Sequence, residues 1–211
     1  MSGFEVDDAL RGTITGRLGG FARRAIAAPG FRAAAVAIVV TSRPGDDTAA
    51  ILFTLRSSRL GRHRGQFALP GGRIDAGETD IAAALRELDE ELGVRLETHQ
   101  VLGRLDDYAT RSGYRITPVV AWAGRSLHLK PDPGEVEESY HIPLAELDSP
   151  AIPLFEAGSK PGRPVLYSRL PSLGHAMYAP TAAILYQFRE VALRGLDTRV
   201  AHYDQPAFAW T

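Results

Sequence analysis

Glu87, Glu90 and Glu91 are the side chains of this sequence best suited to chemistry. On a helical wheel drawn at about 100° per residue, their carboxylates share one sector. Carboxylates at i, i+3 and i+4 repel one another and destabilise an isolated helix by a few tenths of a kcal/mol for each pair. We therefore expect a cation to neutralise them, and hard oxygen ligands indicate Mg²⁺ or Mn²⁺. The spacing predicts a metal site.

A helix over residues 80–92 is expected to carry these glutamates. Thr79 is a candidate N-cap, and Gly93 stands where a helix stop is expected. The apolar residues of this stretch form a narrow stripe on the same wheel and predict the core face: Ile81, Leu85, Leu88 and Leu92. The glutamates are then expected on the opposite side, toward solvent or a ligand.

Arg86 stands four residues before Glu90 and is expected to orient that carboxylate or to reach back to Glu78. The alternative is an acidic, solvated helix face, which Glu-rich helices often have. That alternative does not predict Glu78 at its offset together with the Leu-Pro-Gly-Gly run at 69–72 and the glycine stop. We therefore favour the metal site.

The segment before the helix is rich in arginine around a Gly-rich turn. Arginine suits bidentate phosphate contacts, so a polyphosphorylated ligand is expected there. The alternative is a solvated basic loop whose arginine stems lie on apolar surface. A lone loop histidine is more often structural than catalytic, so His63 is a candidate substrate contact only. The expected substrate contacts are Arg56, Arg59, Arg62, His63, Arg64, Gly71 and Arg73.

Composition limits the classes of function. The 211 residues, 45% hydrophobic and 23% charged, indicate one globular domain with extensions. A net charge of −1 argues against a general nucleic-acid or membrane-surface binder. The absence of cysteine excludes a disulfide framework and a thiolate nucleophile. No apolar run approaches the roughly 20 residues of a membrane span, and the acidic start is unlike a signal peptide, so the cytoplasm is the expected compartment.

Apolar runs predict the elements that must position these residues. Strands are expected at 33–41, 49–55, 66–69, 94–105, 114–123 and 165–170, and a further helix at 180–193. One or two helices are expected within residues 1–30. Strands flanking helices predict an α/β fold, with a mixed β-sheet between helical layers.

Residues 72–94, GRIDAGETDIAAALRELDEELGV, resemble the signature of the Nudix hydrolase superfamily at every defined position. Residues 52–72, LFTLRSSRLGRHRGQFALPGG, look like the extra signature of its coenzyme A pyrophosphatase branch, from which Gly61, Phe67 and Leu69 depart. The resemblance implies a Nudix-like α/β/α sandwich. It implies three parts: a helical extension at 1–32, the Nudix hydrolase domain at 33–195, and a tail at 196–211 that packs on the domain or on a partner subunit.

The resemblance also implies roles at the site. Mg²⁺ or Mn²⁺ would be held by the Gly72 carbonyl with Glu87, Glu90 and Glu91, while Glu90, Glu91 and Arg86 would act in catalysis. Members of the superfamily take a general base from this motif or from a later loop. The acidic, loop-like stretch 133–138 makes Glu137 a candidate base, although a solvated acidic turn would explain it equally well.

The implied reaction is metal-dependent hydrolysis of a nucleoside diphosphate linkage in a small-molecule substrate. The first hypothesis is coenzyme A or an acyl form of it, giving adenosine 3′,5′-bisphosphate and 4′-phosphopantetheine. The second is a Nudix pyrophosphatase for ADP-ribose, dinucleotides or nucleotide sugars. The third, a nucleotide-binding module without catalysis, is disfavoured because all the helix glutamates are present. No nucleic-acid or membrane partner is expected, and a homodimer is left open.

Overall fold

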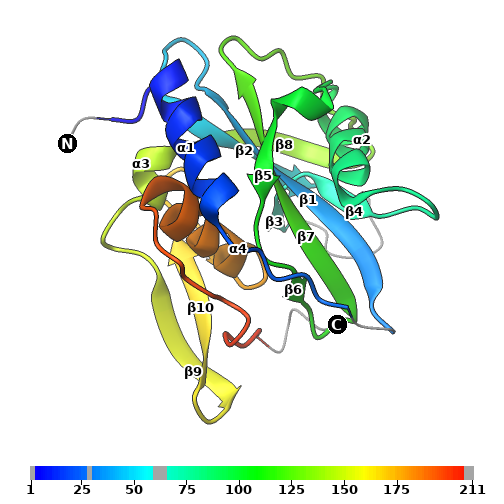
Figure 1. The fold of residues 1–211 in the computed structure, drawn as a ribbon, viewed down its shortest axis with the longest axis vertical. Coiled ribbons are helices and arrows are strands. Elements are labelled where there is room, and N and C mark those ends of the chain that lie inside the picture. Colours follow the sequence, from blue (N-terminus) through cyan, green and yellow to red (C-terminus); the bar gives the residue numbers. More distant parts are fainter. Residues whose placement is uncertain (1–2, 28–29, 59–65, 207–211) are drawn as a thin grey trace.

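A mixed β-sheet forms the middle layer of the molecule (Figure 1). The computed structural model describes residues 3–27, 30–58 and 66–206. The strand order is β3-β2-β1-β7-β5, with β8 on β2, β4 on β1 and β6 on β7; β1 and β7 pair in parallel. The strands are β1 (Arg32–Ser42), β2 (Ala49–Arg56), β3 (Phe67–Ala68), β4 (Gly71–Arg73), β5 (Val101–Arg104), β6 (Tyr108–Ala109), β7 (Tyr114–Gly124) and β8 (Val136–Pro143).

Helices cover both faces of this sheet (Figure 1). Helix α2 (Asp80–Leu92) lies on one face, where Ala35, Ala37 and Val39 of β1 pack in the same buried cluster as Leu88. Helices α1 (Asp8–Gly20) and α4 (Thr181–Phe188) lie on the other, against the alternate residues of β1. Strands buried on both faces read as continuous apolar runs, as β1 does. The predicted sandwich with a mixed sheet between helical layers is confirmed.

Helix α2 has the predicted bounds. The Thr79 hydroxyl accepts a hydrogen bond from the Ala82 N–H at 3.1 Å, and Gly93 ends the helix in the left-handed region at φ 67°. Of the predicted core face, Leu88 and Leu92 are buried and Ile81 packs half-buried against the same cluster, whereas Leu85 is only half-buried. The residues buried against the sheet are Ala83, Ala84, Leu88, Glu91 and Leu92.

Several expected elements differ in extent. The stretch 94–105 forms a strand only at β5, after the 3₁₀ turn η1 (Thr98–Gln100). The helix expected at 180–193 is α4 followed by the π-helical turn η2 (Arg189–Leu193). The run at 165–170 lies in a second sheet, β9 (Leu154–Lys160), β10 (Arg163–Arg169) and β11 (Ala176–Tyr178), two of whose strands were not predicted. A short helix α3 (Leu144–Leu147) follows β8.

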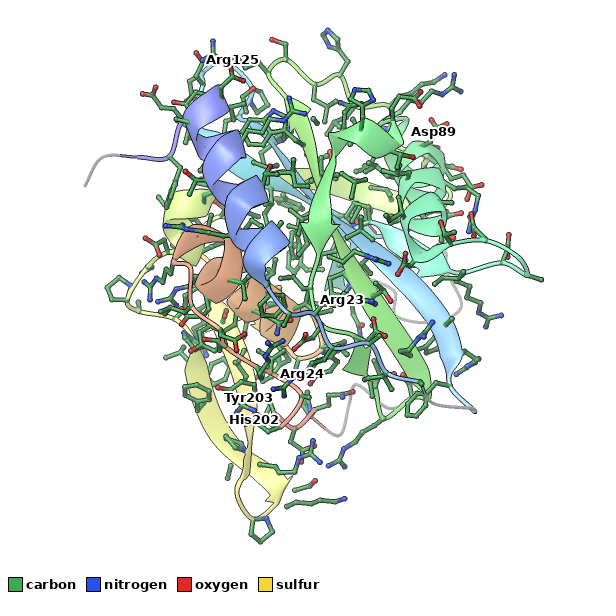
Figure 2. The ribbon with its side chains drawn as sticks, viewed as in Figure 1. Arg23, Arg24, Asp89, Arg125, His202 and Tyr203 are labelled. Atoms are coloured by element: carbon green, nitrogen blue, oxygen red, sulfur yellow. The ribbon has the colours of Figure 1, made fainter. Side chains whose placement is uncertain are left out.

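The segments outside the central sheet are tied to it by Asp106 and Asp107. The Asp107 carboxylate accepts hydrogen bonds from Arg23 at 2.5 Å and from the Ile26 N–H at 2.8 Å. The Asp106 carboxylate accepts one from Arg199 at 2.7 Å. Arg23, labelled in Figure 2, also donates to the Leu105 carbonyl at 3.0 Å. The N-terminal segment and the tail therefore pack on the same domain.

The described part of the tail ends beside the second sheet. Tyr203, labelled in Figure 2 next to His202, stacks on Phe155 with ring centroids 5.5 Å apart. Residues 207–211 lie outside the described residues, and the division into 1–32, 33–195 and 196–211 stays a prediction. None of the helices in the described ranges is both long enough and apolar enough to span a membrane.

Candidate active site

The turn that joins β3 to β4 delivers the chain to α2 through two glycines. A Cβ at Gly71 would lie 2.3 Å from the Ala35 carbonyl oxygen, and φ at Gly71 is 154°. A Cβ at Gly72 would lie 2.3 Å from Oε1 of Glu87. Glycine is therefore required for close contact between the Gly72 backbone and the Glu87 carboxylate. The structure brings these two predicted ligands together.

Arg86 joins the glutamates of the loop and the helix. Its Nε and Nη2 donate to the two Glu78 oxygens at 3.0 and 3.1 Å, and its Nη1 donates to Glu87 and Glu90, each at 2.9 Å. Nη2 also donates to the Arg73 carbonyl at 2.9 Å. The hydrogen bond from Arg86 lowers the pKa of Glu78, and Glu78 in turn raises the pKa of Arg86. Arg86 was expected to contact Glu90 or to reach back to Glu78, and its side chain does both.

The helical wheel placed Glu91 on a face turned to solvent or a ligand, but the structure buries it. Its side chain is 2% exposed, against the end of β2 and the glycine turn. Oε1 lies 3.4 Å from Arg56 Nη1, and Oε2 accepts a hydrogen bond from the Gly71 N–H at 3.3 Å. Loss of solvation raises the pKa of Glu91 to about 8, against the lowering influence of Arg56. The ionised form of a carboxyl buried this deeply is stabilised only by a nearby cation.

Glu87 and Glu90 differ in burial. The Glu87 side chain is 15% exposed, and burial is the main cause of its raised pKa, which the Arg86 contact opposes. The negative charges of Glu90 and Glu135 raise it further. Glu90 is 54% exposed and faces solvent. Figure 2 labels Asp89, the acid next to Glu90, on α2.

The donor chemistry fits a hard divalent cation. Glu87 and Glu91 are poorly solvated carboxyl groups: burial raises the pKa of both, and the negative charge of Glu135 raises both further. A nearby cation would remove this penalty. Within 3–27, 30–58 and 66–206, no three acidic or histidine side chains converge closely enough to hold an ion as they stand. Glu87 and Glu90, whose oxygens are hydrogen-bonded to Arg86, would be the glutamates to exchange that partner for an ion.

The predicted substrate-binding residues fall in different places. Arg56 points to Glu91, so it lies beside the acidic site. Arg73 turns away from the glutamates and donates from Nη2 to the Tyr114 hydroxyl at 3.1 Å. Four members of the predicted set lie outside the described residues: Arg59, Arg62, His63 and Arg64.

The acidic stretch expected to be a loop becomes strand β8 from Val136 onward, so that expectation is wrong for its second half. Glu137 is exposed on β8, and its Oε2 accepts a hydrogen bond from the Ser58 N–H at 3.2 Å. Glu138 accepts one from the Tyr140 hydroxyl at 2.5 Å. Among the glutamates of this stretch, Glu135 is the one whose negative charge raises the pKa of both Glu87 and Glu91. Its carbonyl is held by the Ser57 N–H at 2.8 Å, a pairing between distant residues that the sequence did not reveal.

Comparison with known proteins identifies the family and the fold. A family model described as the NUDIX domain matches residues 31–162. Uncharacterised Nudix hydrolases called NudL, from Citrobacter koseri and Escherichia coli, are 41% and 40% identical over 118 residues. Each match covers 54% of this chain and 59% of the relative's length. A MutT/nudix family protein from Enterococcus faecalis superposes with a TM-score of 0.51 at 15% identity, covering 79% of this chain and 64% of that one, which shows the fold.

Proposed function

The chain belongs to the Nudix family, and we propose that it hydrolyses the diphosphate linkage of a small nucleoside diphosphate compound. The observation that carries the proposal is the burial of Glu91 beside Glu87, Arg56 and the glycine turn. Burying a carboxylate among other carboxylates destabilises the folded protein, and a bound metal ion would offset that destabilisation. The region matched by the family model includes all of these residues.

We propose that Glu87, Glu90, Glu91 and the Gly72 carbonyl hold Mg²⁺ or Mn²⁺. Such ions, when bound, neutralise a diphosphate and acidify a water molecule. Glu91 is fixed by burial and by the Gly71 N–H, so it supplies the most rigid of these oxygens. Arg86 keeps Glu87 and Glu90 on one side of α2 through its paired hydrogen bonds. Arg56, beside Glu91, is suited to contact the substrate's phosphate oxygens.

The general base is proposed to come from the segment that enters β8. The sequence pointed to Glu137, which is exposed and bound by Ser58 N–H. The structure supports Glu135 in preference, because its charge acts on Glu87 and Glu91 from a separate element. A carboxylate there would accept a proton from the attacking water without giving up a metal ligand.

Coenzyme A or an acyl form of it is the proposed substrate, with adenosine 3′,5′-bisphosphate and 4′-phosphopantetheine as products. Support comes from the signature-like sequence of residues 52–72 and from Arg56, which lies beside Glu91 of the acidic helix. The alternative is a Nudix pyrophosphatase for ADP-ribose, dinucleotides or nucleotide sugars. A non-catalytic module is disfavoured because the carboxylates and Arg86 are all in place. A cytoplasmic location and a homodimer remain predictions from the sequence.

The test is product identification by mass spectrometry after incubation with Mg²⁺ or Mn²⁺ and a panel of substrates. The panel holds coenzyme A, acetyl-coenzyme A, ADP-ribose, a dinucleotide and a nucleotide sugar. We expect cleavage of coenzyme A at its diphosphate, and none by Glu91→Gln. Preferred cleavage of another compound would overturn the coenzyme A proposal and retain the diphosphatase. If the folded protein cleaves none of them with either metal, the proposed hydrolase activity is wrong.

A further inference from the structure

Arg32, Tyr114 and Arg73 meet on one face of the sheet beside the site. Arg32 of β1 pairs with Tyr114 of β7, and Ala34 of β1 pairs with Arg73 of β4. Positions 32 and 34 share a face of β1, so the three side chains project together. The guanidinium carbons of Arg32 and Arg73 lie 4.0 and 5.9 Å from the Tyr114 ring centroid. We call these three residues the arginine–tyrosine cluster.

Neither arginine of the cluster has a carboxylate partner in the described parts of the chain. Arg32 donates to the Ser112 carbonyl at 2.7 Å, and Arg73 donates to the Tyr114 hydroxyl from Nε and Nη2 at 3.4 and 3.1 Å. Both side chains are exposed. Two like charges held against one ring repel each other, so the arrangement favours binding of an anion between them. Nearby Arg115 differs, because it lies 3.8 Å from the Asp107 carboxylate.

The cluster is connected to the active site through Arg73. Arg73 directly follows Gly72, and its carbonyl accepts a hydrogen bond from Arg86 Nη2 at 2.9 Å. Its side chain leaves the opposite way, to Tyr114. The backbone of Arg73 therefore contacts Arg86, while its guanidinium contacts Tyr114. An anion at the cluster would belong to a ligand that extends beyond the glycine turn.

We infer that the arginine–tyrosine cluster binds a phosphate monoester carried by the substrate, separate from the diphosphate that is cleaved. A phosphate dianion suits two guanidinium groups, which donate paired hydrogen bonds to its oxygens. The inference rests on the proposed function and deepens it, because coenzyme A carries a 3′-phosphate and ADP-ribose does not. Free inorganic phosphate shares this chemistry, and the experiments separate the two sources.

The first experiment compares kcat/KM for coenzyme A and 3′-dephospho-coenzyme A in wild type and Arg32→Gln. Charge-assisted hydrogen bonds are worth roughly tenfold or more in binding. We expect Arg32→Gln to lower kcat/KM for coenzyme A about tenfold, mainly through KM, and to leave the dephospho compound within about twofold. Arg95→Gln is the matched control, because it removes an equally positive side chain that is 86% exposed and pairs with Asp89. Equal losses on both substrates, or none, would overturn the inference.

The second experiment measures binding by calorimetry and does not depend on turnover. Wild type should bind adenosine 3′,5′-bisphosphate about tenfold more tightly than AMP, and Arg32→Gln should remove that preference. Inorganic phosphate should compete with the bisphosphate. If phosphate binds in an Arg32-dependent way without competing, the cluster takes a free anion and the substrate assignment fails. If no coenzyme A is cleaved but the bisphosphate preference depends on Arg32, the proposed substrate fails and the cluster remains a phosphate monoester site.

Discussion

Arg56 at the end of β2 lies beside Glu91 of α2, with Nη1 3.4 Å from Oε1. The contact joins the arginine-rich segment to the acidic helix through a side chain that is only 2% exposed. Without metal or substrate, the arginine that the sequence assigned to phosphate and the glutamate that it assigned to metal contact each other, while burial keeps the pKa of Glu91 raised. The first two predictions concern this buried glutamate.

Glu91→Gln should abolish turnover and preserve the fold. Glutamine has nearly the same shape, so the packing of α2 is kept while the metal-binding charge is lost. We expect kcat to fall by orders of magnitude, because catalysis depends on the metal. Steady-state kinetics and circular dichroism check both points. Near-normal kcat in a folded Glu91→Gln protein would refute the assigned site.

Without divalent metal, the protein should lose stability as pH rises. Burial raises the pKa of Glu91 to about 8, above its ordinary value of 4.5 in an unfolded chain. Between these values the folded state binds a proton that the unfolded state lacks, so the free energy of unfolding falls with increasing pH, by at most about 1.4 kcal/mol per pH unit for this one group. Glu87 contributes in the same direction.

Urea unfolding in a chelator at about pH 6 and about pH 8.5 measures this slope. Glu91→Gln should flatten it, and saturating Mg²⁺ should flatten it in wild type, because the metal keeps Glu91 ionised in the folded state, as it already is in the unfolded chain above about pH 6. A wild-type stability that is constant across this range would contradict the burial of an ionisable group at position 91.

Gly72→Ala should weaken metal binding while sparing the fold. The new Cβ would lie 2.3 Å from Oε1 of Glu87, the mobile end of a side chain, so Glu87 can turn away at little cost. We expect a clear rise in the Mg²⁺ concentration needed for half-maximal activity. Gly12→Ala is the control, since a Cβ there meets nothing within 4 Å in α1 and should add up to about 1 kcal/mol of stability. An unchanged metal requirement in Gly72→Ala would remove Glu87 and Gly72 from the ligand set.

Glu135→Gln and Glu137→Gln should have different effects. If Glu135 is the general base, its loss should lower kcat by roughly 10²- to 10⁴-fold with little change in KM or Mn²⁺ affinity, and high pH should restore part of the rate. Glu137→Gln should lower kcat less than about tenfold, because its carboxylate is exposed and held by Ser58 N–H. The reverse order would return the base to Glu137, as the sequence first suggested.

The sequence alone determined what depends on near neighbours along the chain. The bounds of α2 follow from the Thr79 cap, the Gly93 stop and a run of good helix formers. The Arg86 contacts to Glu78 and Glu90 follow from their spacing along the same loop and helix. Strands β1, β2 and β7 could be predicted from the sequence because a strand buried on both faces is a continuous apolar run.

Only the tertiary structure decided what depends on pairing between distant segments. Glu91 has the same position on a helical wheel whether its side of the helix meets water or strand β2, so its burial could not be read from periodicity. Strand β8 carries charges on its exposed side and is held by β2, which made its acidic start resemble a loop. Arg32, Arg73 and Tyr114 come together only through the strand register. Local propensity fixes each element, and the contacts between elements fix which of its side chains meet the site.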